Sequence, residues 1–159
     1  MKNPRPNPQP KWLRKFPVVF YQKEGKSKFE HVTLIAVENP PSKKDNDFVL
    51  SVAARACRNL GVPGLPFLLK FKFTTLETSE HMLKKNLKRA AQANCFGQVE
   101  IDKLAWRDAS PRTRRHVLVH EIAHVAEALF TSRQSDHGPG FTRFVRRAGI
   151  KPNRMDRRY

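Results

Sequence analysis

The stretch SPRTRRHVLVHEIAHVAEALFT, residues 110–131, decides the fold that the sequence predicts. Ser110 is a favourable N-cap and Pro111 a favourable first helical residue. Apolar side chains then recur at helical spacing, at Leu118, Ile122, Val125 and Leu129. This periodicity predicts one long helix whose apolar stripe packs on a core.

Within this predicted helix, residues 120–124 read His-Glu-Ile-Ala-His. Positions four apart lie one turn apart on one face, so the imidazoles of His120 and His124 can reach one metal ion. Glu121 then lies beside the pair, where its carboxylate can take a proton from a metal-bound water. The pattern predicts a zinc site with Glu121 as the general base of a hydrolase.

A catalytic zinc site takes three protein ligands and keeps one position for water. A histidine six residues after His124, as in one HExxH pattern, is excluded because Phe130 occupies that position. No glutamate follows Glu127, which excludes a glutamate ligand on a later helix. His137 opens the loop before the next expected helix, where the chain can turn back to the metal. The downstream candidates are Asp136, His137 and Asp156.

Two plainer interpretations of these histidines compete with a metal site. Histidines of the core should share the apolar stripe, whereas His120 and His124 lie roughly opposite it. A purely solvated face stays open as an alternative, although Val117 and Ala123 flank the pair, so this face is not uniformly polar. We expect His116 behind the ligands or at the surface, because three histidines on successive turns cannot close on one ion without bending the helix.

The rest of the sequence predicts a small α+β fold. Short segments rich in β-branched and aromatic residues are typical of strands, and they lie at 17–23, 29–37, 67–73 and 93–101. Further helices are predicted at 47–60, 78–89 and 140–148. We expect a short, mostly antiparallel sheet packed on the HExxH helix.

Composition divides the chain into three parts. Residues 1–10 alternate proline with polar residues and residues 11–16 are basic and aromatic, and together they are predicted to form a flexible arm. Residues 17–150 suit a single domain, and 151–159 a basic tail. The sequence has no apolar run long enough to cross a membrane and no secretory h-region, and its two cysteines favour free thiols. We therefore expect a cytoplasmic protein without membrane contact.

The chain is strongly basic, with 31 Lys and Arg against 14 Asp and Glu and a formal net charge of +17. Such a surface attracts polyanions, and nucleic acid is the usual one. Arginines gather at the ends of the two downstream helices, and the expected nucleic-acid contacts are Arg112, Arg114, Arg115, Arg143, Arg146 and Arg147. This pattern indicates a nucleoid- or DNA-associated protein, with a solvated charge run as the competing interpretation.

The run 120–124 followed by His137-Gly138-Pro139-Gly140-Phe141 resembles the SprT-like/Spartan metallopeptidase family, which pairs HExxH with a later His-Gly-x-x-Phe. The resemblance covers roughly residues 67–148 and is strongest at 90–148. It implies a small zincin-type domain, one Zn²⁺ ion held by His120, His124 and His137, and Glu121 as the catalytic residue. The paired CxxC motifs of the zinc ribbon that such proteins often carry do not occur in this sequence.

The expected function is a zinc-dependent metalloendopeptidase that hydrolyses DNA-bound or DNA-crosslinked proteins, as the resemblance also implies. We expect the segment Gly97, Gln98 and Val99 to form an exposed strand edge that holds an extended peptide substrate. Two other classes stay open: a non-enzymatic, basic nucleic-acid-binding protein with a structural zinc site, and a viral or mobile-element interaction factor on the same fold. The sequence leaves the oligomeric state open.

Overall fold

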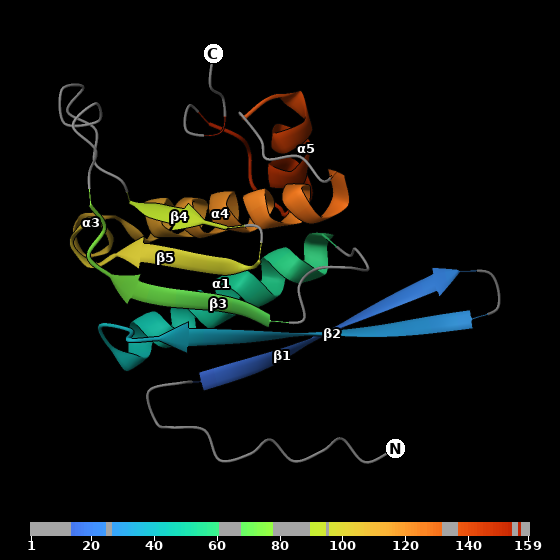
Figure 1. Ribbon diagram of the computed structural model, residues 1–159, viewed down its shortest axis with the longest axis horizontal. Helices are drawn as coiled ribbons and strands as arrows, with labels where there is room; N and C mark the ends of the chain where they lie inside the picture. The colour runs from blue at the N-terminus through green and yellow to red at the C-terminus, as the bar shows by residue number, and fades with distance from the viewer. Residues whose placement is uncertain are drawn as a thin grey trace.

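The computed structural model describes residues 14–24, 27–60, 68–77, 90–94, 96–131, 137–153 and 156. These residues form an α+β fold with one five-stranded sheet and four helices (Figure 1). In chain order the elements are β1 (Arg14–Glu24), β2 (Ser27–Glu38), α1 (Lys43–Leu60), β3 (Leu68–Thr74), β4 (Ala91–Ala93), β5 (Gln98–Asp102), α3 (Lys103–Asp108), α4 (Pro111–Thr131) and α5 (Pro139–Arg147). In the described part of the chain, no helix is both long and apolar enough to cross a membrane.

The sheet is mixed, with the strand order β1-β2-β3-β5-β4. The pairs β1–β2 and β4–β5 are antiparallel, whereas β2–β3 and β3–β5 are parallel. The expectation of a mostly antiparallel sheet is therefore wrong. The crossover through α1 brings β3 beside β2 in the same direction, which a helix between two strands typically does.

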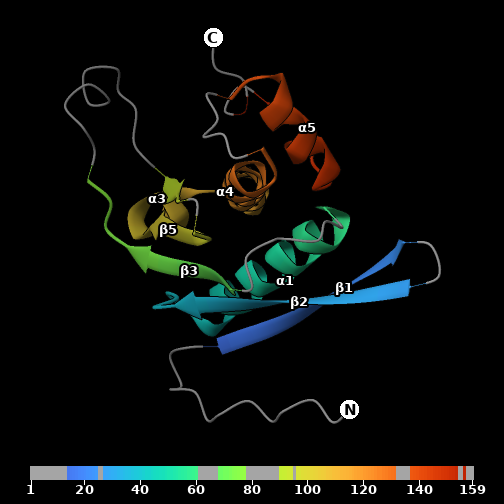
Figure 2. The ribbon, with the colours of Figure 1, turned by 45° about the vertical axis from the view of Figure 1, so that its right-hand side comes forward.

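Helices cover one face of the sheet (Figure 2). In β3, Leu69, Phe71 and Phe73 are fully buried, whereas the intervening Lys72 is exposed. Such alternation is typical of a strand with one face on the core. Figure 2 shows α1 and α4 side by side over that face, with α5 packed on α4 farther from the sheet.

The segment predicted as one strand at 93–101 is instead a hairpin. β4 ends at Ala93, the chain turns through Gly97 with φ of +85°, and β5 begins at Gln98. β5 pairs with β3 on one side and β4 on the other, and Val99 is fully buried. The exposed edge expected at Gly97, Gln98 and Val99 is therefore wrong, because β4 covers that side and is itself the edge strand.

Local capping explains where α1 and α3 begin. α1 begins at Lys43 rather than 47, because the Ser42 hydroxyl accepts the backbone N–H of Asp45 at 3.1 Å. The short helix α3 was not among the predicted helices. Its N-cap is Asp102, whose carboxylate accepts the backbone N–H of Ala105 at 2.9 Å.

The helices α4 and α5 follow their predictions closely. Ser110 accepts the N–H of Thr113 at 3.2 Å as the cap of α4, and Leu118, Ile122 and Val125 are fully buried. The side chain of Leu129 lies outside the described residues. In α5 and at its C-cap, Phe141, Val145 and Ala148 are buried, whereas Arg143, Arg146 and Arg147 are exposed.

The expected boundaries change at both ends of the domain. β1 begins at Arg14, so three residues of the predicted arm belong to a strand. The predicted tail 151–159 contains Asp156, which is fully buried against α4. The helix predicted at 78–89, residues 1–13 of the arm and Cys95 lie outside the described residues. Cys57 is free and buried, and burial raises the pKa of its thiol to about 12.

Candidate metal centre

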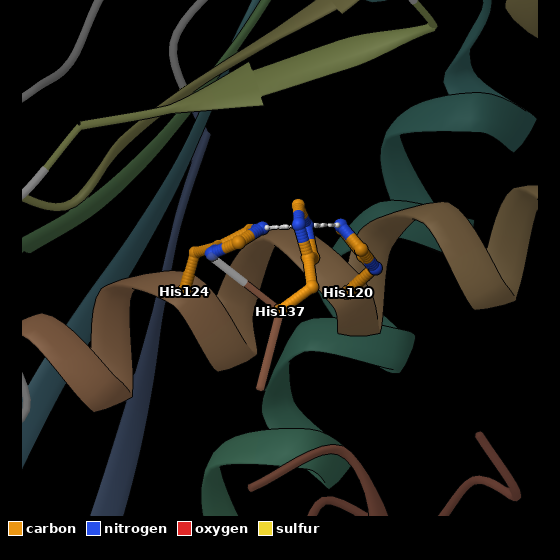
Figure 3. A group of neighbouring side chains, drawn as sticks. All are labelled: His120, His124 and His137. Carbon is orange, nitrogen blue, oxygen red and sulfur yellow. Dashed lines mark hydrogen bonds between the residues drawn. The ribbon is translucent and has the colours of Figure 1, made fainter. Parts of the chain in front are cut away.

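Three imidazoles meet on the side of α4 that faces away from α1 (Figure 3). His120 and His124 come from successive turns of α4, and His137 comes from the residues just before α5. Their Nε2 atoms lie 3.1 Å apart for His120 and His124, 2.9 Å for His124 and His137, and 3.1 Å for His120 and His137. The structure thus brings together the three residues that the sequence predicted as ligands, and they are close enough to bind one metal ion.

The spacing of these nitrogens fits a tetrahedral metal ion. With metal–nitrogen bonds of about 2.0–2.1 Å, two ligands of a tetrahedral zinc lie about 3.3 Å apart. The observed separations of 2.9–3.1 Å are close to that value. In the described residues no Cys, Asp or Glu joins the group.

The residues of the centre differ in burial. His120 and Glu121 are buried, whereas His124 and His137 are partly exposed. Glu121 follows His120 directly on α4, so its Cα–Cβ bond is turned by about 100° from that of the ligand.

His137 adopts a backbone conformation that is uncommon outside glycine. Its φ is +59°, in the left-handed region. A non-glycine residue there costs on the order of 1–3 kcal/mol and persists only where its surroundings hold it. Such strain concentrates at binding sites, which agrees with a residue whose ring must turn back to the two histidines of α4.

The Phe141 ring packs against all three imidazoles. Its ring is fully buried, stacks on His124 at 4.2 Å between centroids, and meets His120 and His137 edge-on at 5.0 Å. The ring restricts the rotation of the imidazoles because an aromatic neighbour leaves few rotamers free. In the sequence, Phe141 stands out only as part of the His-Gly-x-x-Phe run, and that pattern does not predict these ring contacts.

Asp156 lies outside the three converging imidazoles but is hydrogen-bonded to one of them. Its Oδ1 lies 2.6 Å from Nδ1 of His120, and its Oδ2 lies 2.7 Å from Nε2 of His116. Burial by itself would raise the pKa of Asp156, but hydrogen bonds from His120, the backbone N–H of Asn153 and His116 lower it below its usual value. The carboxylate is therefore ionised and accepts both hydrogen bonds.

His116 lies behind the three converging imidazoles, which is one of the two positions expected for it. It is buried and bonded to Asp156, and is not among the three converging imidazoles. Asp156 was one of the candidate ligands in the sequence. No local pattern predicts its hydrogen bonds to His120 and His116, because these contacts span 36 and 40 residues.

The arginines expected to bind nucleic acid do not share one environment. Arg112, Arg143, Arg146 and Arg147 are exposed and Arg115 is partly buried. Arg114 instead donates to the carbonyls of Trp106 and Arg107 at 2.8 and 3.3 Å and lies over the Trp106 ring. Through these contacts Arg114 joins α4 to α3.

The comparisons with known proteins add no relative of this chain: no family model, no curated protein and no solved structure matches it.

Proposed function

We propose that this protein is a zinc-dependent metallopeptidase in which His120, His124 and His137 hold one Zn²⁺ ion and Glu121 is the general base. The observation that carries the proposal is the convergence of three Nε2 atoms within 3.1 Å of one another. The resemblance of the HExxH and His-Gly-x-x-Phe runs to the SprT-like family supports it. The choice of zinc follows from three neutral nitrogen donors and one open position.

The zinc ion and Glu121 would have separate roles in peptide hydrolysis. Zinc at such a site supplies Lewis acidity and lowers the pKa of water to about 7. The Glu121 carboxylate takes the proton of the attacking water on its side-chain oxygen and delivers it to the leaving amine. Its burial beside His120 keeps that proton transfer away from bulk solvent.

The edge strand β4 is the element that suits an extended peptide. Backbone hydrogen bonds join Ala90 to Asp102 and Asn94 to Gln98. The backbone N–H and C=O groups of residues 90, 92 and 94 therefore point toward β5. Because alternate residues of an antiparallel strand point to opposite edges, Ala91 and Ala93 direct their N–H and C=O groups away from the sheet. A substrate strand can add there by main-chain hydrogen bonds. β4 packs against α4, which carries the histidines (Figure 1).

A purely structural metal site fits these residues less well. Structural zinc sites are closed by four protein ligands, and the described residues supply three. Two of those three imidazoles are partly exposed. A buried carboxylate next to the first ligand is also more useful to a hydrolase than to a structural site.

The charge of the surface supports a second part of the proposal, association with DNA. A pocket of about 130 Å³ between α1 and α4 is lined by Arg55, Arg115, Ser51 and apolar side chains, with no carboxylate in its wall. Guanidinium groups bind phosphate oxygens in pairs of hydrogen bonds. With a net charge of +17, the protein would hold polyanions near this pocket.

The decisive experiment compares wild type with Glu121→Gln for cleavage of a DNA-binding protein, with and without DNA. We expect Glu121→Gln to bind one zinc ion per chain with unchanged affinity and to lose at least about 100-fold in kcat, because the general base contributes roughly 10²–10⁴-fold. Glu77→Gln makes the same chemical change at an exposed carboxylate and should cleave like wild type.

Two results would contradict this proposal. Equal cleavage by wild type and Glu121→Gln would remove the general-base assignment. A wild-type protein that binds zinc stoichiometrically but cleaves no protein substrate, with or without DNA, would favour the structural-site alternative.

A further inference from the structure

The residues that follow α5 fold back onto α4 and reach the metal centre from behind. Pro152 is buried, and the backbone N–H of Asp156 donates to the carbonyl of Asn153 at 3.1 Å. The N–H of Asn153 in turn donates to Oδ2 of Asp156 at 2.7 Å. These two bonds fix the direction in which the Asp156 carboxylate points. We name residues 150–153 and 156 the clasp.

The carboxylate of the clasp joins two histidines one turn apart on α4. Oδ1 accepts from Nδ1 of His120 and Oδ2 accepts from Nε2 of His116, at 2.6 and 2.7 Å. Asp156 is 0% exposed, so these bonds are shielded from water. A buried carboxylate is costly unless its oxygens are hydrogen-bonded, and here three donors satisfy them.

The bond to His120 determines which of its nitrogens can bind a metal. An ionised carboxylate only accepts hydrogen bonds, so the proton of a neutral His120 lies on Nδ1. Its Nε2 then presents a lone pair to the point where the three imidazoles meet. A carboxylate behind a ligating histidine also fixes the ring plane and raises the basicity of the ligand.

The hydrogen bond from His116 keeps the Asp156 carboxylate behind His120. Without a second partner, a carboxylate so near the centre could rotate away from His120. The bond from His116 to Oδ2, together with the Asn153 N–H, holds that oxygen on the far side. Asp156 thereby has one oxygen for each histidine, and His120 keeps a fixed orientation.

We propose that the clasp is a working part of the metal centre: Asp156 is a positioning residue that presets His120 for metal binding, and His116 anchors Asp156. This inference rests on the metal site of the proposed function and on no assumption about substrate. A merely structural role for Asp156 would lower the stability of the metal-free fold but would leave intrinsic metal affinity unchanged in folded protein.

The test measures zinc affinity by competition with a chromophoric chelator, on metal-free protein shown to be folded by circular dichroism. We expect Asp156→Asn to weaken zinc binding by roughly 10–100-fold, the range found when the partner of a ligating histidine is removed. Asparagine keeps the size of the side chain, but its NH₂ or C=O cannot replace both acceptor oxygens. The control is Asp108→Asn, an exposed aspartate on α3, which should bind zinc like wild type.

Two further measurements separate positioning from folding. With Co²⁺ in place of zinc, we expect the visible absorption bands of Asp156→Asn to differ in energy and intensity from those of wild type, because the ligand field reports the orientation of His120. His116→Gln keeps Asp156 and should weaken zinc binding by a smaller factor, several-fold. This variant also tests the clasp if Asp156→Asn does not fold.

The outcomes distinguish failure of the clasp from failure of the proposed function. Zinc affinity within twofold of wild type in both Asp156→Asn and His116→Gln, with an unchanged Co²⁺ spectrum, would overturn the clasp while leaving the metal site intact. A wild-type chain that binds no divalent metal would overturn both.

Discussion

Gly149 follows α5 in a backbone conformation that a side chain would strain. Its φ is +102°, and a Cβ at this position would lie 2.6 Å from Nδ2 of Asn59, which donates to the carbonyl of Ala148. We expect Gly149→Ala to destabilise the metal-free protein by about 1–3 kcal/mol. Urea unfolding measures the difference.

Gly138→Ala is the control, since its Cβ would meet nothing within 4 Å, and it should change stability by less than about 0.5 kcal/mol. Equal effects of the two substitutions would contradict the conformational argument.

At the scale of single residues, the sequence identified the metal ligands but not the residues that support them. The i, i+4 spacing of His120 and His124 is a local property of one helix, and a single later histidine then completes the set. The roles of Asp156 and Phe141 depend on how α5 and the clasp fold back onto α4. Such contacts between distant residues carry no periodicity that a sequence pattern could show.

At the scale of helices, Asp45 in the first turn of α1 links three of them. Its carboxylate accepts from the Ser42 hydroxyl at 2.6 Å and from the Trp106 indole of α3 at 2.8 Å, and it pairs with Arg114 of α4 at 3.5 Å. Partial burial would raise the pKa of Asp45, but the hydrogen bonds of Ser42 and Trp106 and the charge of Arg114 lower it below 3.8.

This shift predicts how stability changes with pH. A carboxyl group whose pKa is lowered by folding stabilises the native state above its unfolded pKa, and the contribution is lost as pH falls through the folded pKa. We expect Asp45→Asn to cost roughly 1–2 kcal/mol at pH 7 and the difference from wild type to disappear below the ordinary value of 3.8. Denaturant unfolding at a series of pH values checks this.

The control is Asp108→Asn, which removes an exposed ion pair and should differ little from wild type in stability at any pH. A difference from Asp45→Asn that stays constant down to pH 2 would contradict the assignment.

The elements themselves were predictable where local signals are strong. α4 and α5 follow from a cap or an N-terminal proline and from 3.6-residue periodicity, and β3 follows from alternation in 68–73. The β4–β5 hairpin was missed because Gly97 was interpreted as an interruption within one strand rather than as its turn. The parallel pairing of β2 and β3 depends on the path of α1 over the sheet, which a strand's own sequence does not encode.

At the scale of the whole molecule, the excess positive charge predicts binding to DNA that depends on salt rather than on base sequence. Each phosphate contact contributes roughly 0.9 to the slope of log K against log salt for duplex DNA. We expect the double variant Arg55→Gln/Arg115→Gln to reduce that slope by about 2, measured by fluorescence anisotropy with a labelled duplex.

The control removes two charges elsewhere on the surface. Lys103 and Arg107 are exposed on α3, outside the pocket, so Lys103→Gln/Arg107→Gln should change the slope less than the pocket variant. If both double variants reduce the slope equally, the positive charge acts as a diffuse field and the pocket is not a phosphate site.

The central claim is that three imidazoles form one metal site, and zinc titration of the metal-free protein tests it most directly. We predict one zinc ion per wild-type chain, and an affinity reduced in His137→Ala by more than the roughly 10–100-fold expected for loss of a supporting residue, with an unchanged circular dichroism spectrum. Stoichiometric zinc bound equally tightly by wild type and His137→Ala would contradict the claim, and so would a wild-type protein that binds none.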